Sequence, residues 1–472
     1  MERSSDTGRT EVGQYVCSLV GSTIRCKNAH TDDEVSIEIN DILCALPDRS
    51  QEGLGYKVSY LHRRLEEKDS SGQGQDARLE SIRTASLPPT LLSQHLCTEI
   101  PAHLSVASRD RRTNLHIILS LGSGVGGARN AFKNSIQPFL SFLGLNNYEV
   151  HETSSGQTIA ELARSFLQLA RNGVSQTIIL VSGDGGLTDV VDVFYSNDNL
   201  EMASFCPPTI ALIASGTGNA MASSTGLLDH PISGLMTLLR GRPEPIPVLC
   251  ASFSPGSQYI TDEGRRRISL DDNGLAGQPL KIYGAVVASW GMHASLVADS
   301  DTAEYRKFGA DRFKMAAKEL LYPSSGDETH KYNGIVTFTM LNSETRKVYT
   351  KTINSSQHMY VLATLVPNLE RDFRISPDSK ALDGRLRVIH FGPMSPERAM
   401  QLMGLAYQNG KHVHEETVTY TEVEGLKIEL LEEDEKWRRV CIDGKIITVQ
   451  QGGWMEVHKE AKHLLNLVTH GP

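Results

Sequence analysis

The chain has 472 residues, enough for about three domains of ordinary size or two large ones. Its 56 acidic and 47 basic residues give a net charge of −9, which excludes a nucleic-acid-binding protein that relies on a broad positive field. No apolar run reaches the ~18 residues of a spanning helix, and the first twenty residues lack the order of a signal peptide. Seven scattered cysteines without a CxxC pair indicate reduced thiols, so we expect a cytoplasmic protein.

Residues 1–61 alternate short apolar runs with polar residues, which predicts a small β-rich N-terminal region. Residues 62–112 are expected to form a polar linker. Their first half carries almost no large apolar side chain before Leu87, so that it could not offset its ordering entropy.

The order strand, glycine-rich loop, helix occurs three times between residues 113 and 245. Strands are predicted at 115–120, 177–182 and 209–215, each followed by glycines and then by a helical pattern. This order is typical of a parallel α/β sheet whose loops gather at the carboxyl ends of the strands. Residues 113–245 are therefore predicted to form an α/β nucleotide-binding lobe.

Residues 246–472 contain many strand-like runs and only two helical segments, at 311–322 and 396–407. This pattern predicts a mostly antiparallel second lobe, a β-sandwich or a barrel. The predicted fold class is therefore α/β, with a parallel-sheet nucleotide-binding lobe followed by a mostly antiparallel β-sandwich lobe, and with the small β-rich region at the N-terminus.

The glycine loops favour phosphate binding. Small residues at helix N-termini let a phosphate approach unpaired N–H groups, and the helix dipoles favour its charge. The first loop alone, with Gly122, Gly124 and Gly127, also fits a dinucleotide site in which Glu149 or Glu152 would bind a ribose. No GK[ST] motif occurs, which excludes a P-loop, and neither an HRD nor a DFG motif of protein kinases is present.

The second loop, Ser-Gly-Asp-Gly-Gly at 182–186, places Asp184 between glycines at a strand end. In phosphoryl transfer such a carboxylate can accept the proton of an attacking hydroxyl or align it. The alternative, an Asp-Gly hairpin turn, conflicts with the helical spacing of the apolar residues that follow.

Five stretches together resemble the diacylglycerol kinase-type catalytic domain, and particularly its sphingosine (long-chain base) kinase branch. They are SGDGG at 182–186, ASGTGNAMASS at 214–224, SWGMHASLVADSDTAEYRKFGADRF at 289–313, ALDGRLRVIHFG at 381–392 and VCIDGKIITVQQGGWMEVH at 440–458. The resemblance extends over most of residues 113–460.

The resemblance implies an ATP- and Mg²⁺-dependent lipid kinase in which Asp184 is the catalytic base. It places one acid of the stretch, Asp299 or Asp301, beside the ammonium group of a long-chain base. The residues that it assigns to the nucleotide are Ser123, Gly124, Ser182, Gly183, Gly185, Gly186, Ser215, Gly216, Thr217, Gly218, Asn219, Arg306, Arg312, Asp443 and Gly444.

The sequence departs from the family pattern at several positions. The first loop has Ser120-Leu121 where the family has Asn-Pro, and it lacks the usual lysines. Asp189 occupies a position where the family has Glu, and Lys445 occupies one where the family has an acid. Residues that would hold a metal are not identified.

We expect phosphorylation of the primary hydroxyl of a sphingoid base, with a membrane-derived lipid substrate, peripheral contact with membranes and no nucleic acid. Diacylglycerol and ceramide are alternative substrates. An NAD(P)-binding oxidoreductase and a catalytically weak lipid-binding scaffold are alternatives from other classes, and homo-oligomer formation is left open.

Overall fold

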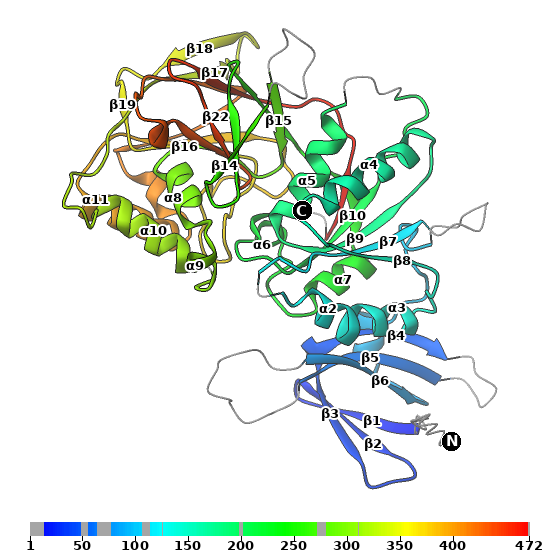
Figure 1. Ribbon diagram of the computed structural model, residues 1–472. Helices are drawn as coiled ribbons and strands as arrows, with labels where there is room; N and C mark the ends of the chain where they lie inside the picture. Colours follow the sequence, from blue (N-terminus) through cyan, green and yellow to red (C-terminus); the bar gives the residue numbers. More distant parts are fainter. Residues whose placement is uncertain are drawn as a thin grey trace, which may run out of the picture. The chain divides into compact units, whose positions relative to one another are not determined.

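The computed structural model describes residues 14–48, 55–63, 77–105, 114–124, 126–197, 202–270, 280–309 and 311–470 (Figure 1). Contacts divide the chain into two compact units. Unit 1 comprises residues 1–105 and 129–148, and unit 2 comprises residues 106–128 and 149–472. Within the described residues, no helix is long and apolar enough to cross a membrane.

Unit 1 is built on a six-stranded sheet with the order β3-β2-β1-β6-β5-β4. Its strands are β1 (Gln14–Val20), β2 (Thr23–Asn28), β3 (Glu34–Glu38), β4 (Ile42–Asp48), β5 (Gly55–Arg63) and β6 (Ala77–Thr84). The short helix α1 (Pro89–His95) follows, and Leu91 joins the buried core of the sheet. The helical segments of this unit are α2 (Ala128–Ala131), a π-helical turn (Phe132–Ile136) and α3 (Gln137–Phe142).

The structure corrects two expectations for this unit. The segment predicted as a polar linker contains two elements, β6 and α1. β6 pairs with β5 along eight residues and buries Leu79 and Ile82. Backbone hydrogen bonds to a neighbouring strand let a largely polar segment join the sheet. Cys17 and Cys26, expected as thiols, form a disulfide, because the β1–β2 hairpin places them directly opposite each other. Residues 64–76 and 106–112 of the predicted linker lie outside the described residues.

The first lobe of unit 2 contains the predicted sheet, in the order β11-β27-β10-β9-β7-β8, and all neighbours in it are parallel except β11, which is antiparallel to β27. Its strands are β7 (Leu115–Leu119), β8 (Glu149–Glu152), β9 (Thr177–Ser182), β10 (Thr209–Ala214), β11 (Arg242–Pro245) and β27 (Asn466–Thr469). Its helices are α4 (Thr158–Arg171), α5 (Asp184–Tyr195), α6 (Ala220–Ser224) and α7 (Ser233–Arg240). β27, drawn in red in Figure 1, comes from far beyond the expected boundary at residue 246 and pairs in parallel with β10.

The second lobe consists of two antiparallel sheets, ordered β15-β12-β26-β23-β17-β18, with β19 beside β17, and β14-β13-β25-β24-β16-β20-β21-β22. The strands are β12 (Leu249–Phe253), β13 (Gln258–Thr261), β14 (Arg266–Ser269), β15 (Leu280–Gly284), β16 (Val287–Gly291), β17 (Tyr332–Leu341), β18 (Val348–Thr352), β19 (Gln357–His358), β20 (Tyr360–Thr364), β21 (Leu386–Phe391), β22 (Val418–Val423), β23 (Gly425–Leu430), β24 (Arg439–Ile442), β25 (Lys445–Thr448) and β26 (Trp454–Lys459). The helices are α8 (Met292–Ser300), α9 (Ala303–Arg306), α10 (Asp311–Leu321) and α11 (Pro396–Ala406).

The buried indole of Trp290 shows how the two sheets face each other. Trp290 belongs to β16, and a Cβ added at Gly334 of β17 would lie only 2.7 Å from its ring. Only glycine leaves room for the indole at this crossing. The expected class, a parallel α/β lobe followed by a mostly antiparallel sandwich, is confirmed.

Candidate active site

The three glycine loops after β7, β9 and β10 touch one another through their backbones. A Cβ on Gly216 would overlap the Cα of Gly183, and one on Gly124 would overlap the carbonyl oxygen of Ser215. The hydroxyl of Ser123 accepts a hydrogen bond from the N–H of Gly183 at 3.0 Å and so joins the first loop to the second. The glycines are therefore required by close packing of the loops as well as by any ligand.

The third loop is closed by Asn219, which has a left-handed backbone (φ 53°). Its side-chain oxygen accepts the N–H of Gly216 at 2.9 Å, and its amide donates to the carbonyl of Gly216 at 2.8 Å. Asn is one of the few residues that adopt this conformation readily. The side chain of Asn219 thus shapes the loop and leaves Thr217 and Gly218 on the wall of the cavity.

Asp184 is the first residue of α5, and its carboxylate reaches the start of α6. The N–H of Ala220 donates to Oδ2 at 2.6 Å and the N–H of Met221 donates to Oδ1 at 3.0 Å. Burial raises the pKa of Asp184, while these two hydrogen bonds oppose the rise. The half-buried carboxylate faces the cavity, where a raised pKa makes it a better proton acceptor than an ordinary Asp.

Asp443, at a turn with positive φ (48°), is held by the backbone of the second lobe. Its carboxylate accepts the N–H groups of Ala285, Val286 and Val287 at 2.6, 3.0 and 2.6 Å, and the hydroxyl of Thr188 at 3.3 Å. Burial raises its pKa to about 6, and these amides oppose the rise. Asp443 lines the cavity, but its oxygens are already engaged, so its carboxylate connects α5 to the sandwich.

Two residues that break the family pattern contact each other. The ammonium group of Lys445 lies 3.4 Å from a carboxylate oxygen of Asp189 and 2.9 Å from one of Asp192. Burial lowers the pKa of Lys445, but attraction to the two carboxylates outweighs it and the pKa is raised. The positive charge of Lys445 is therefore balanced by Asp189 and Asp192, an arrangement that the separate positions in the sequence did not reveal.

The acids and arginines of the stretch 289–313 divide into two ion-pair groups. Asp301 lies 2.9 Å from Arg306 and 3.6 Å from Arg312, and all three line the cavity. Asp299 instead pairs with Arg439 at 2.7 Å and is not among the residues that line it. The structure thus separates the two acids between which the sequence could not choose.

The cavity has a volume of about 760 Å³ and continues from the glycine loops into an apolar chamber. The chamber is lined by side chains from α8, α10, α11 and the residue after it, and from the loop between β20 and β21: Met292, Leu296, Phe313, Leu321, Leu369, Phe373, Met403 and Tyr407. Sequence reasoning named none of these residues, although their apolar character on helices was a weak signal.

Most of the sequence-predicted nucleotide residues reach this cavity: Ser123, Gly124, Gly183, Gly185, Gly216, Thr217, Gly218, Arg306, Arg312, Asp443 and Gly444. Ser182, Gly186, Ser215 and Asn219 are not among its lining residues. The Ser182 hydroxyl lies under Gly186, where an added Cβ would overlap it, so these two residues support the second loop from behind. Glu149, the alternative ribose ligand, does not line the cavity either.

Comparison with known proteins agrees with this geometry. Residues 114–251 match the diacylglycerol kinase catalytic domain. The chain is 23% identical over 372 residues to "Sphingosine kinase 1" of Arabidopsis thaliana, covering 73% of this chain and 70% of that protein. It is 40% identical over 72 residues to "Sphingosine kinase B" of Dictyostelium discoideum, covering 15% of this chain and 9% of that protein.

A solved structure from Bacillus anthracis str. Sterne, named a "putative diacylglycerol kinase", shares the fold. Its TM-score is 0.51 at 13% identity, and the match covers 76% of this chain and 98% of that one. This likeness concerns the fold. The matched domain and the sphingosine kinase relatives indicate the activity: residues 114–251 match a diacylglycerol kinase catalytic domain, and the protein is a lipid kinase, that is, a phosphotransferase.

Proposed function

We propose that the protein transfers the γ-phosphate of ATP to the primary hydroxyl of a sphingoid long-chain base and produces its 1-phosphate. The observation that carries the proposal is the single cavity that joins three glycine loops and Asp184 to an apolar chamber. A phosphate donor and a lipid acceptor need such a continuous space, because the reacting oxygen must approach the γ-phosphorus in line.

At the polar end, the backbone N–H groups of the loops would bind the phosphates of ATP, and Arg306 and Arg312 would add charge from the second lobe. Mg²⁺ is bound in kinases by phosphate oxygens and one or two carboxylates. Asp189 lines this end of the cavity, and only one of its oxygens faces Lys445, so its carboxylate could contact such an ion. When bound, the ion would neutralise charge on the phosphates.

Asp184 would act as the catalytic base. One face of its carboxylate is fixed by Ala220 and Met221, so the remaining lone pairs are oriented toward the cavity without freedom to rotate away. A base held in this way loses little entropy when the substrate hydroxyl arrives.

At the acceptor end, Asp301 is the acid that we assign to the substrate ammonium group. It lines the cavity beside Arg306, whereas Asp299 is engaged by Arg439. A charged headgroup that enters a largely apolar space requires a partner of opposite charge. The long chain would occupy the chamber between α8, α10 and α11.

A second candidate, phosphorylation of diacylglycerol or ceramide, is favoured by one observation. Asp301 is already paired with Arg306 and approached by Arg312, so it presents less net negative charge to an amine than a free carboxylate would. A neutral headgroup does not need that charge. Cytoplasmic location, peripheral contact with membranes and homo-oligomer formation stay predictions.

The test is the transfer of labelled γ-phosphate from ATP to sphinganine, diacylglycerol and ceramide in detergent micelles. We expect labelled sphinganine phosphate from the wild type, none from Asp184→Asn, and a selective loss with sphinganine for Asp301→Asn. Asp311→Asn, which removes an exposed carboxylate of α10 outside the cavity lining, is the matched control. Label on diacylglycerol or ceramide alone would show that the substrate is that lipid and not a sphingoid base. No label on any lipid would favour a lipid-binding scaffold.

A further inference from the structure

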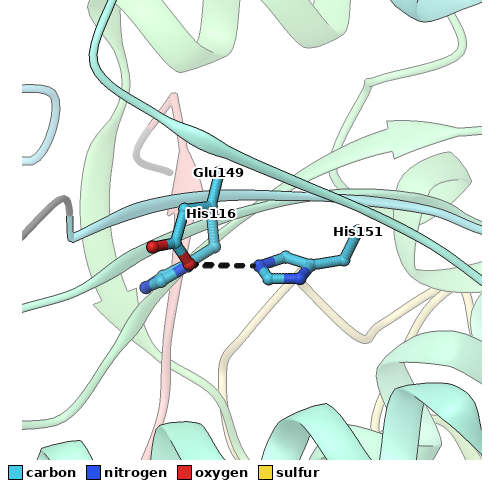
Figure 2. Close-up of side chains that lie close together, drawn as sticks. All are labelled: His116, Glu149 and His151. Carbon is cyan, nitrogen blue, oxygen red and sulfur yellow. Dashed lines mark hydrogen bonds and ion pairs between the residues drawn. The ribbon is translucent and has the colours of Figure 1, made fainter.

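Three potential metal ligands come together on β7 and β8, at residues that do not line the cavity (Figure 2). His116 lies directly opposite Glu149 in the parallel pair, and His151 follows Glu149 by two residues. Because side chains alternate along a strand, all three side chains project from the same face of the sheet. Phe166 of α4 packs on that face, with ring centroids 4.7 Å from His116 and 6.1 Å from His151.

The distances among the three ligand atoms match a metal site. Nδ1 of His116, Oε2 of Glu149 and Nε2 of His151 are separated by 3.4, 3.7 and 3.4 Å. Tetrahedral zinc with bonds of ~2.0–2.1 Å places its ligand atoms about 3.3–3.4 Å apart. An ion could therefore contact all three atoms with only small side-chain adjustments.

The chemistry of the three groups selects the kind of ion. Metals bind the neutral form of imidazole, and His116 and His151 each offer one ring nitrogen to the cluster. The carboxylate and the two imidazole nitrogens then meet at one point, where either a shared imidazole proton or a bound cation can stabilise them. Two nitrogen ligands favour zinc and related first-row ions over Mg²⁺ or Ca²⁺, which prefer oxygen.

We propose that His116, Glu149 and His151 bind a zinc ion, with a fourth position left to water. His116 is buried, while Glu149 is exposed, so the ion would reach the site from the solvent side of the strand pair. The inference does not depend on the lipid substrate.

The position of the site indicates a structural role. Among the described residues β8 is the last strand of the sheet and pairs only with β7. Directly after β8, the hydroxyl of Thr153 accepts the N–H of Leu121 in the first glycine loop at 2.9 Å. Zinc across the two strands would therefore fix the edge strand and, through Thr153, support the first loop.

The test uses the full chain without an affinity tag, treated with EDTA and then titrated with Zn²⁺ by calorimetry. We expect one Zn²⁺ per chain and a loss of affinity in Glu149→Gln and His151→Gln that exceeds the ~10- to 100-fold caused by loss of an outer-shell partner of a metal ligand. Glu161→Gln on α4 and His414→Gln, both exposed, are matched controls and should bind as the wild type does. Glu149→Gln alters an exposed side chain, so circular dichroism should show an intact fold.

A second readout is the visible spectrum of the Co²⁺-substituted chain, which should show tetrahedral bands that Glu149→Gln and His151→Gln lose. Zn²⁺ should also raise the Tm of the wild type and of both controls, but not of these two variants. The absence of stoichiometric Zn²⁺ in the wild type would overturn the proposal. Unchanged binding by both ligand variants would do so as well, because the zinc would then lie elsewhere, for example on a free cysteine.

Discussion

Replacement of Asp184 by Asn separates the catalytic role of this residue from its structural one. In the wild type the carboxylate oxygens of Asp184 accept the N–H groups of Ala220 and Met221 at 2.6 and 3.0 Å. Asn has the same shape, but its single side-chain oxygen can replace only one of these two acceptors. Loss of one charge-assisted hydrogen bond costs about 1.5–3 kcal/mol. Because burial raises the pKa of Asp184, the neutral amide also avoids a desolvation cost, and the net loss in unfolding free energy should be near 1 kcal/mol.

The effect on catalysis should be much larger. Loss of a general base lowers kcat by about 10²- to 10⁴-fold, or ~3–5 kcal/mol of barrier. We would measure kcat in the labelled-phosphate assay and Tm by calorimetry on the same preparations. A kcat within tenfold of the wild type, with a Tm lower by many degrees, would refute the reasoning and leave Asp184 as a helix cap alone.

The pH dependence of the rate supplies an independent check on Asp184. A base acts only when deprotonated, and burial raises the pKa of this carboxyl, so kcat should fall on the acid side at a pH above the ordinary Asp value of 3.8. An acid limb at or below that value would contradict the assigned base.

Three further predictions concern the cavity walls. Lys445→Met removes the cation that lies between the carboxylates of Asp189 and Asp192. It should lower the unfolding free energy, measured by urea denaturation, by about 3 kcal/mol. Adding Asp189→Asn should restore part of this loss, and no recovery would contradict the pairing of the two residues. Asp443→Asn should destabilise by about 2–3 kcal/mol. Since the folded-state pKa of Asp443 is raised from 3.8 to about 6, the wild type should lose stability from this group as pH rises through that window, and the variant should not. Gly404 lines the cavity and faces open space. Gly404→Leu should therefore lower the rate of phosphorylation of long-chain substrates but not of short-chain ones, and Gly404→Ala should leave both rates unchanged. An equal loss of rate with both chain lengths would exclude the chamber as the lipid site.

The sequence predicted the parts of the site that depend on local pattern. Each glycine loop directly follows a strand of a parallel sheet, so topology alone brings Ser123, Gly183 and Gly216 together. The pairing of Asp189 with Lys445 could not be predicted in this way, because the two belong to different lobes and only tertiary packing unites them.

Strand β6 and the disulfide show the same limit in unit 1. Composition identified residues 77–84 as polar, but the partner strand β5 decides whether such a segment is ordered. Cys17 and Cys26 are nine residues apart, a spacing with no motif, and only the register of the hairpin makes them neighbours. His116 and His151 likewise meet only through the pairing of β7 with β8.

The position of β27 has a consequence for how the protein is made. This strand lies between β10 and β11 in the sheet of the first lobe, yet the whole sandwich separates it from β10 along the chain. During synthesis the first lobe therefore emerges from the ribosome with a gap beside β10, and that strand edge stays open until Asn466–Thr469 has been translated. The nucleotide-binding sheet should consequently be among the last parts of the molecule to reach its final structure.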